Sequence, residues 1–178
     1  TGKGASQGIL IKSAEALETA HHIDTVVLDK TGTITMGTPK VTDVIAESKF
    51  TKNELLKVAG SIESLSEHPL AAAIVDYNKQ VNNSMFTATD FKMHAGRGLT
   101  AVVNGTHVIA GNELLMIENN IDTTQIKGKL DAFAKEGKTP LCFAIDGVFA
   151  GIIAVADTIK PTSPTGVLEL KEMGLDVI

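Results

Sequence analysis

A short apolar run that stops at an acidic residue and opens into a Thr/Gly loop constrains the fold of this chain most. Residues 25–28 (Thr-Val-Val-Leu) have the composition of a strand, and residues 29–33 read Asp-Lys-Thr-Gly-Thr. A strand of this kind brings its last side chain to the carboxyl edge of an α/β sheet, where loop N–H groups can bind phosphate. Asp29 can then accept a phosphoryl group as an aspartyl-phosphate. A single strand-end Asp more often caps a turn, but capping does not explain the whole pentad.

The segment 29–35, Asp-Lys-Thr-Gly-Thr-Ile-Thr, resembles the phosphorylation motif of P-type ion-pumping ATPases. The resemblance implies that Asp29 is phosphorylated and that Lys30 helps to hold the phosphate. It also implies that Mg²⁺ lies between the Asp29 carboxylate and the Thr31 carbonyl, which are oxygen ligands that a hard cation prefers. Phosphatases of the same haloacid-dehalogenase-like superfamily carry a second Asp, their general acid and base, where this chain has Thr31. Its absence favours a pump that holds its phosphoenzyme over a phosphatase.

Local signals elsewhere indicate strand and helix at both ends of the chain and an antiparallel insert with two helices between them. Asn-Gly at 104–105 and Asp-Gly at 146–147 are two-residue hairpin turns. Thr38-Pro39 is expected to break the pattern before the first strand of the insert. The expected strands of the insert are residues 41–46, 86–93, 99–103, 106–110, 140–145 and 148–155. Helix starts are predicted at Ser13, at the Thr51/Glu54 capping box, and at Pro69, Asn112 and Pro164.

Residues 66–70, Ser-Glu-His-Pro-Leu, stand at the start of the second helix of the insert. A histidine held there can direct a hydrogen-bonding aromatic ring at a ligand, although His68 and Glu67 can equally serve only to cap the helix. Residues 94–99, His-Ala-Gly-Arg-Gly-Leu, and the pair Gly111-Asn112 follow. Their glycines can let the backbone approach a flat or phosphorylated ligand, but a lone Gly-x-Gly is as often a bulge or a turn.

Together, these segments resemble the nucleotide-binding domain of heavy-metal-transporting P-type ATPases, of which Ser-Glu-His-Pro-Leu is the hallmark. The resemblance implies that this part of the chain binds ATP and that Asp157 lies at the hinge between two domains. It also implies that Leu99 forms an apolar wall at a position that is often Ile or Val. The residues that match nucleotide contacts are Glu63 and His68 at the adenine, Gly96 and Gly98 where the backbone gives it room, and Gly111 and Asn112.

The resemblance covers essentially the whole chain and therefore implies its fold class and domains. The expected fold is α/β, with a partial haloacid-dehalogenase-like (Rossmann-like) phosphorylation domain formed by residues 1–38 and 156–178. Residues 39–155 form an inserted α+β nucleotide-binding domain built on an antiparallel sheet. Both ends look cut, and the later Thr-Gly-Asp and Gly-Asp-Gly segments of the family do not occur in the 178 residues. We therefore expect this chain to bind ATP without turning it over.

Composition argues against several functions. The net charge is −5 and the basic residues are thinly spread, so no basic face is available to a nucleic acid. The single cysteine, Cys142, lies in an apolar run, which predicts a buried thiol and excludes a disulfide framework within one chain. The longest apolar run, residues 152–156, is far below the roughly 20 residues of a membrane helix. The segment itself is therefore expected to be soluble.

The resemblance implies an enzyme: the ATP-binding and phosphorylation region of a P-type ATPase that exports heavy-metal cations, with ATP and Mg²⁺, on the cytoplasmic side of the cell membrane. The transported cation meets a membrane domain outside these residues. Residues 137–141 and 157–161 look most like copper(I) exporters, and zinc or cadmium pumps stay open as well. The histidines do not show which metal is transported, since the sequence patterns around His21-His22 and His107 are typical of surface residues and not of a metal-binding site. Two further functions stay open, a haloacid-dehalogenase-type phosphatase and a non-catalytic nucleotide-binding module.

Overall fold

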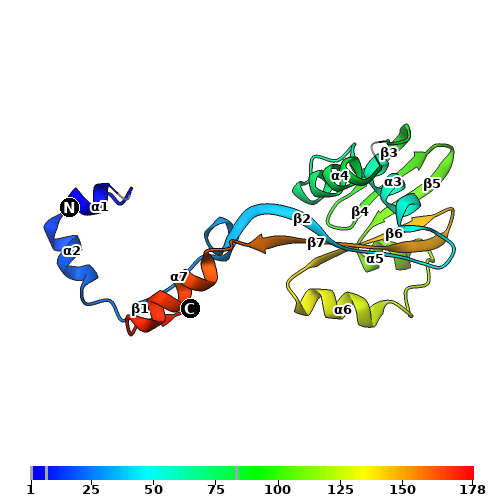
Figure 1. Ribbon diagram of the computed structural model, residues 1–178. Coiled ribbons are helices and arrows are strands. Elements are labelled where there is room, and N and C mark those ends of the chain that lie inside the picture. Colours follow the sequence, from blue (N-terminus) through cyan, green and yellow to red (C-terminus); the bar gives the residue numbers. More distant parts are fainter. Residues whose placement is uncertain (1, 7, 83) are drawn as a thin grey trace. The chain divides into compact units, whose positions relative to one another are not determined.

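Two compact units make up the computed structural model, which describes residues 2–6, 8–82 and 84–178. Unit 1 comprises residues 1–36 and 159–178, and unit 2 comprises residues 37–158. The chain passes from one unit to the other within two long strands, β2 (Thr35–Ala46) and β7 (Val148–Ile159), which are neighbours in one sheet (Figure 1). Unit 2 is therefore an insertion in the sequence of unit 1.

Unit 1 is built from short elements and a two-stranded parallel sheet. β1 (Thr25–Val26) pairs with β8 (Asp176–Val177). The Leu28 N–H donates to the Ile178 carbonyl at 2.8 Å, so the pairing continues to the residue before Asp29. Among the described residues of this unit, Thr35 is the one that is buried. The helices of unit 1 are α1 (Gly2–Ala5), α2 (Ala14–Ala20) and α7 (Ser163–Glu172).

Unit 2 contains a six-stranded sheet in the order β2-β7-β6-β5-β4-β3. The pairs from β3 to β7 are antiparallel, as expected, and both predicted hairpin turns are confirmed. Asn104 and Asp146 have φ angles of 51° and 46° and are each followed by a glycine with positive φ, as two-residue hairpin turns require. The remaining strands are β3 (Ala88–His94), β4 (Gly98–Val103), β5 (Thr106–Gly111) and β6 (Thr139–Ile145).

The first strand of the insert is longer than the sequence predicts. β2 begins at Thr35 rather than at residue 41, and it passes through Thr38-Pro39 without interruption. The expected break at the proline is therefore wrong. Because β2 is an edge strand of the sheet, a residue without a backbone N–H can be accommodated there.

Local capping signals set where the helices begin, and the predicted helix starts are confirmed. The Thr51 hydroxyl accepts a hydrogen bond from the Glu54 N–H at 3.2 Å, and the Glu54 carboxylate accepts one from the Thr51 N–H at 2.8 Å. The side-chain oxygens of Ser13 and Asn112 accept from the Ala16 and Leu115 N–H groups and so cap α2 and α5. The two predicted prolines fall in the first turns of α4 and α7. The helices of unit 2 are α3 (Lys52–Glu63), α4 (Pro69–Asn82), α5 (Glu113–Glu118) and α6 (Lys127–Lys135).

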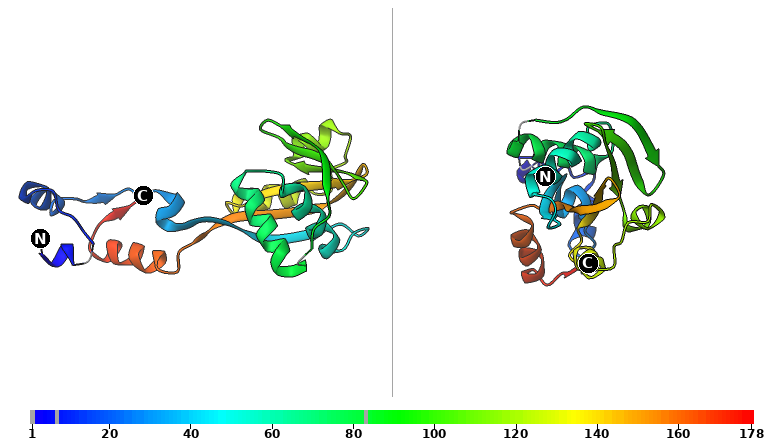
Figure 2. Two further views of the ribbon diagram at one scale, coloured as in Figure 1. Left: turned by 90° about the horizontal axis from the view of Figure 1, so that it is seen from above. Right: turned by 90° about the vertical axis from the view of Figure 1, so that its right-hand side faces the viewer.

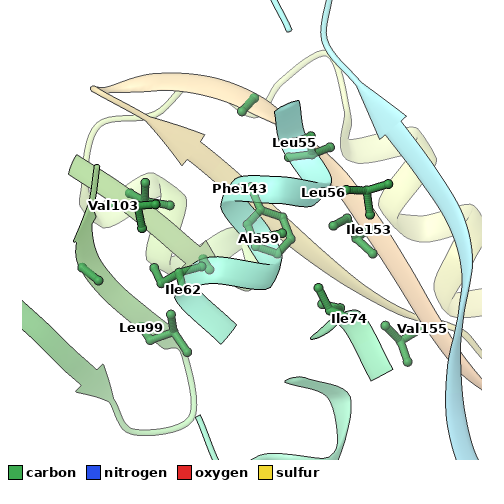
Figure 3. Packing of buried hydrophobic residues seen from close by; sticks show 14 of the residues in the cluster. Leu55, Leu56, Ala59, Ile62, Ile74, Leu99, Val103, Phe143, Ile153 and Val155 are labelled. Carbon is green, nitrogen blue, oxygen red and sulfur yellow. The ribbon is translucent and has the colours of Figure 1, made fainter. Parts of the chain in front are cut away.

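One face of the six-stranded sheet is covered by α3 and α4. These helices lie side by side in both views of Figure 2. Their buried residues Leu55, Ile62 and Ile74 pack with Phe143 from β6 in one cluster, and Figure 3 shows Phe143 against Ala59 of α3. Apolar side chains at helical spacing thus form the layer that the periodicity predicts.

The other face of the sheet is covered by α5 and α6. Cys142 belongs to this second cluster, with Met116 and Phe133, whereas the next residue along β6 belongs to the first, as strand alternation requires. Cys142 is 1% exposed, which confirms the predicted buried thiol. Burial, together with the charge of Glu113, raises the pKa of this thiol to about 12. Across the described residues, no helix combines the length and the apolar character needed to cross a bilayer.

Candidate functional site

A pocket of about 330 Å³ lies in unit 2, where the end of α3 and the start of α4 meet the ends of strands β3 to β6. Its wall includes the buried side chain of Leu99. All six residues that the sequence assigns to the nucleotide line this one pocket: Glu63, His68, Gly96, Gly98, Gly111 and Asn112. The fold therefore brings together residues from four separate segments of the chain.

Glu63 is the acidic group of the pocket. It is the last residue of α3 and is 3% exposed. Burial raises the pKa of its carboxyl to about 7. Among the described residues, we find no hydrogen-bond partner for this carboxyl. A carboxyl of this kind accepts from a ligand amino group when ionised and donates to a ring nitrogen when protonated.

His68 stands immediately before α4 and combines the two roles that the sequence left open. Its Nδ1 accepts a hydrogen bond from the Leu70 N–H at 3.2 Å, which caps the helix. The backbone N–H of His68 donates to the Ser66 hydroxyl at 3.3 Å and fixes the turn ahead of the helix. Because Nδ1 accepts, the ring proton of a neutral His68 is on Nε2, which can donate to a ligand in the pocket.

The three glycines of the pocket differ in what surrounds their Cα atoms. Gly98 and Gly111 are Cα partners in the β4–β5 pairing, and a Cβ on either would overlap the main chain of the opposite strand. These two positions are therefore already fixed by strand packing, without any ligand. Gly96 instead has a φ of 68°, and no atom lies within 4 Å of the place that a Cβ would take, so it leaves open space at the pocket. Open space beside the backbone is thus found at Gly96, whereas strand packing alone requires glycine at the other two positions.

Asn112 joins the glycine turn to α5. Its side-chain amide donates to the Gly96 carbonyl at 3.1 Å, while its side-chain oxygen accepts from the Leu115 N–H at 3.1 Å. The Asn112 N–H donates to the Arg97 carbonyl at 2.8 Å. Asn112 therefore holds the shape of the pocket rim, whether or not it also contacts a ligand.

Some residues of the lining carry chemistry that the sequence did not assign. His94 places Nε2 3.1 Å from the Thr100 hydroxyl. Arg97, between the two glycines, lines the pocket and forms an ion pair with Glu118 at the end of α5. The position of Arg97 inside the Gly-x-Gly was the one available sequence signal for it. Glu118 gave none, because the pair joins residues that are distant in sequence.

The loop that follows Asp29 lies in unit 1 and is held by polar contacts, which are partly buried except for the exposed one from Lys160. The Thr35 hydroxyl donates to the Lys30 carbonyl at 3.0 Å and accepts from the Gly32 N–H at 3.2 Å. From the other arm of unit 1, the Lys160 ammonium donates to the Gly32 carbonyl at 2.6 Å and the Ser163 hydroxyl donates to the Ile34 carbonyl at 2.8 Å. Two segments far apart in sequence thus fix the loop that follows Asp29.

Asp29, Lys30 and Thr31 are all exposed, directly after the β1 strand and its extension. The Asp29 side chain makes no capping hydrogen bond, so the interpretation in which it merely caps the turn is contradicted. The exposed Asp29 carboxylate and the Thr31 carbonyl are oxygen donors of the kind that Mg²⁺ takes, since this ion usually binds few protein groups and completes its shell with phosphate and water. The described residues contain no group of three or more His, Cys, Asp or Glu side chains arranged to hold a metal.

Residues 23–178 match the model of the haloacid dehalogenase-like hydrolase family, and the chain belongs to that family. Over 178 residues it is 41% identical to the copper-transporting P-type ATPase of Rhizobium leguminosarum bv. viciae (100% of this chain, 21% of that protein). It is 42% identical over 178 residues to the copper-exporting P-type ATPase of Bacillus subtilis (strain 168) (100% of this chain, 22% of that protein). It is 39% identical over 177 residues to the silver exporting P-type ATPase of Salmonella typhimurium (99% of this chain, 22% of that protein). The chain thus spans about a fifth of the length of these relatives.

Solved structures agree with this relationship. A zinc-transporting PIB-type ATPase in its E2.Pi state superposes with a TM-score of 0.87 at 30% identity, covering 98% of this chain and 28% of that one. The catalytic domain of the CPx-ATPase CopB-B, from work on conformational changes upon nucleotide binding, gives a TM-score of 0.72 at 27% identity, covering 99% of this chain and 61% of that one. The predicted fold class and the predicted resemblance to copper-type P-type ATPases are therefore confirmed, and these relatives are by name enzymes.

Proposed function

We propose that this chain is the ATP-binding and phosphorylation region of a P-type ATPase that exports heavy-metal cations, copper(I) foremost. One observation carries the proposal: Glu63 and His68 meet a glycine turn in one pocket of the inserted unit, while the other unit presents an exposed Asp29 that caps nothing. A nucleotide pocket in one unit and a phosphate acceptor in the other are the two parts that ATP-driven phosphorylation needs.

Unit 2 is, in this proposal, the nucleotide-binding domain, and the two arms of unit 1 form the phosphorylation domain. The pocket is largely apolar, with a buried carboxyl at its base, which suits a flat base with polar edges. Glu63 and the Nε2 of His68 would hydrogen-bond or stack with adenine. The open space at Gly96 would admit the edge of the ring, and Asn112 would keep the rim in shape.

Phosphoryl transfer would take place at Asp29. A carboxylate oxygen of Asp29 attacks the terminal phosphorus of ATP, a P–O bond forms, and the bond to the β-phosphate oxygen breaks so that ADP leaves with the electron pair. Lys30, on the adjoining turn, would neutralise part of the phosphate charge. Asp29 and the Thr31 carbonyl would hold Mg²⁺, which when bound supplies further neutralisation of the phosphates.

A phosphatase and a non-catalytic module each explain less of the molecule. A phosphatase of the same family needs a general acid two positions after Asp29, and Thr31 has no titratable group there. A non-catalytic nucleotide-binding module has no need for an uncapped Asp29, whose loop is held by Thr35 and Lys160. Addition of p-nitrophenyl phosphate to the purified chain tests for the phosphatase, because a phosphatase releases nitrophenol with it and the proposed pump region does not.

Copper is proposed as the cargo from the printed names of the relatives. Two of those compared are copper ATPases at 41% and 42% identity, whereas the zinc-transporting structure is 30% identical. The membrane domain that would bind the cation lies outside these residues, and the present region would face the cytoplasm. Silver and zinc are the other candidates, from the printed names of the silver exporter at 39% identity and of the zinc-transporting structure at 30% identity.

Labelling of the intact parent protein tests the proposal. Incubation with γ-labelled ATP and Cu(I) should give an acid-stable, hydroxylamine-sensitive label on the protein. With Zn(II) in place of Cu(I), the rate of ATP hydrolysis should be lower. Calorimetric titration of the present chain should show ATP binding. A parent protein that never acquires the label, under any of the tested metals, would show that Asp29 is not a phosphate acceptor.

A further inference from the structure

The pocket of unit 2 has one cationic side chain in its lining, as far as the described residues show. Arg97 is that side chain, and it is also the single arginine of the 178-residue chain. The other charged residue of the lining is Glu63, which is acidic. ATP carries several negative charges, so a pocket that binds its base still needs a cation for the phosphates.

The backbone of Arg97 is fixed while its long side chain reaches the surface. The Arg97 N–H donates to the His94 carbonyl at 2.9 Å, and the Arg97 carbonyl accepts from the Asn112 N–H at 2.8 Å. The side chain of Arg97 is 41% exposed and pairs with Glu118, whose side chain is also 41% exposed. Arg97 thus belongs to the lining of the pocket, while its half-exposed guanidinium is held by the half-exposed carboxylate of Glu118, a residue outside the lining.

A half-exposed ion pair of this kind is a weak contact. Solvent screens both charges, and each long side chain loses conformational freedom when the pair forms. A guanidinium binds phosphate in a two-pronged geometry with charge-assisted hydrogen bonds, which are stronger than an exposed ion pair. A phosphate group that enters the rim can therefore replace Glu118 as the partner of Arg97.

We propose that Arg97 is the residue of unit 2 that contacts the phosphates of the bound nucleotide, and that Glu118 holds it until the nucleotide arrives. The inference rests on the proposed function, which it deepens by assigning the part of the ligand that the adenine contacts do not reach. The Glu118 carboxylate also repels the phosphates. Its removal should therefore tighten binding of a charged nucleotide and leave an uncharged nucleoside unaffected.

Calorimetric titration of the 178-residue chain with ATP and with adenosine tests this assignment. Arg97→Met should weaken ATP binding by roughly tenfold, as loss of one charge-assisted contact does, and leave adenosine binding unchanged. Arg97→Lys should recover part of the loss, because it keeps the charge without the two-pronged geometry. Glu118→Gln should tighten ATP binding about twofold or more without changing adenosine binding.

Lys129→Met provides the matched control. Lys129 is an exposed residue of α6 outside the pocket lining, so the substitution removes the same charge from the same unit. It should change ATP affinity far less than Arg97→Met does. Thermal unfolding of each variant shows whether the fold is kept, and the Glu118→Gln result stands even if Arg97→Met does not fold.

Three outcomes would overturn the assignment. One is equal loss of ATP and adenosine binding in Arg97→Met, which would make the residue structural. Another is that the wild-type chain binds ATP and that neither Arg97→Met nor Glu118→Gln changes its affinity. This outcome would remove the role of Arg97 and leave the proposed function unaffected. The third is a wild-type chain that binds neither ligand, which would remove the proposed function together with this inference.

Discussion

Gly98 lies directly opposite Gly111 in the pairing of β4 with β5, and neither position has room for a Cβ. The overlap at Gly98 is with the Ala110 carbonyl, and the overlap at Gly111 is with the Arg97 carbonyl. Because the obstacle is main chain rather than the end of a flexible side chain, it cannot move without separating the two strands. The close pairing of β4 with β5 at this wall of the pocket therefore requires glycine at both positions.

Replacing one of these glycines should destabilise unit 2. Gly111→Ala should lower the free energy of unfolding by about 2 kcal/mol or more, as overpacking against main chain does. Gly128→Ala is the control, because Gly128 lies in α6 with nothing within 4 Å of a Cβ position, and alanine favours a helix. That change should be neutral or stabilise by up to about 1 kcal/mol. Urea unfolding measures both, and equal effects would show that the close approach is not tight.

Stability should fall as pH rises from about 4.5 to about 7 because of Glu63. Burial raises the pKa of its carboxyl from the ordinary 4.5 to about 7, so the folded state binds this proton more tightly than the unfolded chain does. The proton on Glu63 contributes its full stabilisation to the folded state below the pKa that this carboxyl has in the unfolded chain. This contribution to the free energy of unfolding, about 3 kcal/mol in total, is lost as pH rises through the pKa in the folded state. Urea unfolding at pH 4.5, 6 and 8 should show the decline.

Glu63→Gln should flatten that part of the pH profile, since an amide does not titrate. Asp131→Asn, at an exposed position of α6, should leave it unchanged. The pKa of Asp43 is lowered by its hydrogen bond with Lys138, and that group loses its contribution only as pH falls through its own lower range. A profile with the same slope in wild type and Glu63→Gln would show that another group causes the decline.

His68 should prove to have two separable roles. His68→Ala should weaken ATP binding by about 1 kcal/mol, the size of one aromatic contact, and should also lower the free energy of unfolding by about 1 kcal/mol, because α4 loses its cap. His68→Asn supplies a capping oxygen without the ring. It should restore the stability and not the ATP affinity, as measured by thermal unfolding and calorimetry. Recovery of both would mean that the ring only caps the helix.

Asp29 should be required for phosphorylation and not for nucleotide binding. Asp29→Asn in the intact parent protein should abolish the hydroxylamine-sensitive label, because an amide oxygen is a poor nucleophile. The same change in the present chain should leave its ATP affinity within about twofold of wild type, since the pocket lies in the other unit. Asp24→Asn, five residues earlier and also exposed, should keep the label. A label that survives Asp29→Asn would place the acceptor elsewhere.

Features that are local in sequence could be predicted, and those made by distant contacts could not. The Thr51/Glu54 capping box and the turns at Asn104 and Asp146 depend only on nearby backbone groups, and all three are present. The continuation of β2 through Pro39 depends on that strand being at the sheet edge. Nothing in a sequence window shows which strand lies at an edge, so the local pattern at the proline predicts a break.

The candidate site shows the same division. Short motifs predicted His68 and the glycines, the family resemblance implied Glu63 as well, and the fold gathers them in one pocket. The motif did not separate the glycines required by strand pairing from Gly96, because that depends on which strands pair and in what register. The ion pair of Arg97 could not be predicted either, because the cap at Asn112 indicates where α5 begins but not what Glu118, at the other end of that helix, contacts.

The hydrogen bond from the Gly37 N–H to the Asp157 carboxylate, 3.2 Å long, joins the first residue of unit 2 to one at its far end. The two ends of unit 2 therefore lie close together. If unit 2 were removed, the two ends left in unit 1 would be neighbours and could be joined directly, as is typical of a domain inserted into another. Residues 37–158 are thus suited to exchange between related proteins or to circular permutation, and such an exchange would carry the proposed nucleotide pocket and leave the proposed phosphate acceptor Asp29 in place.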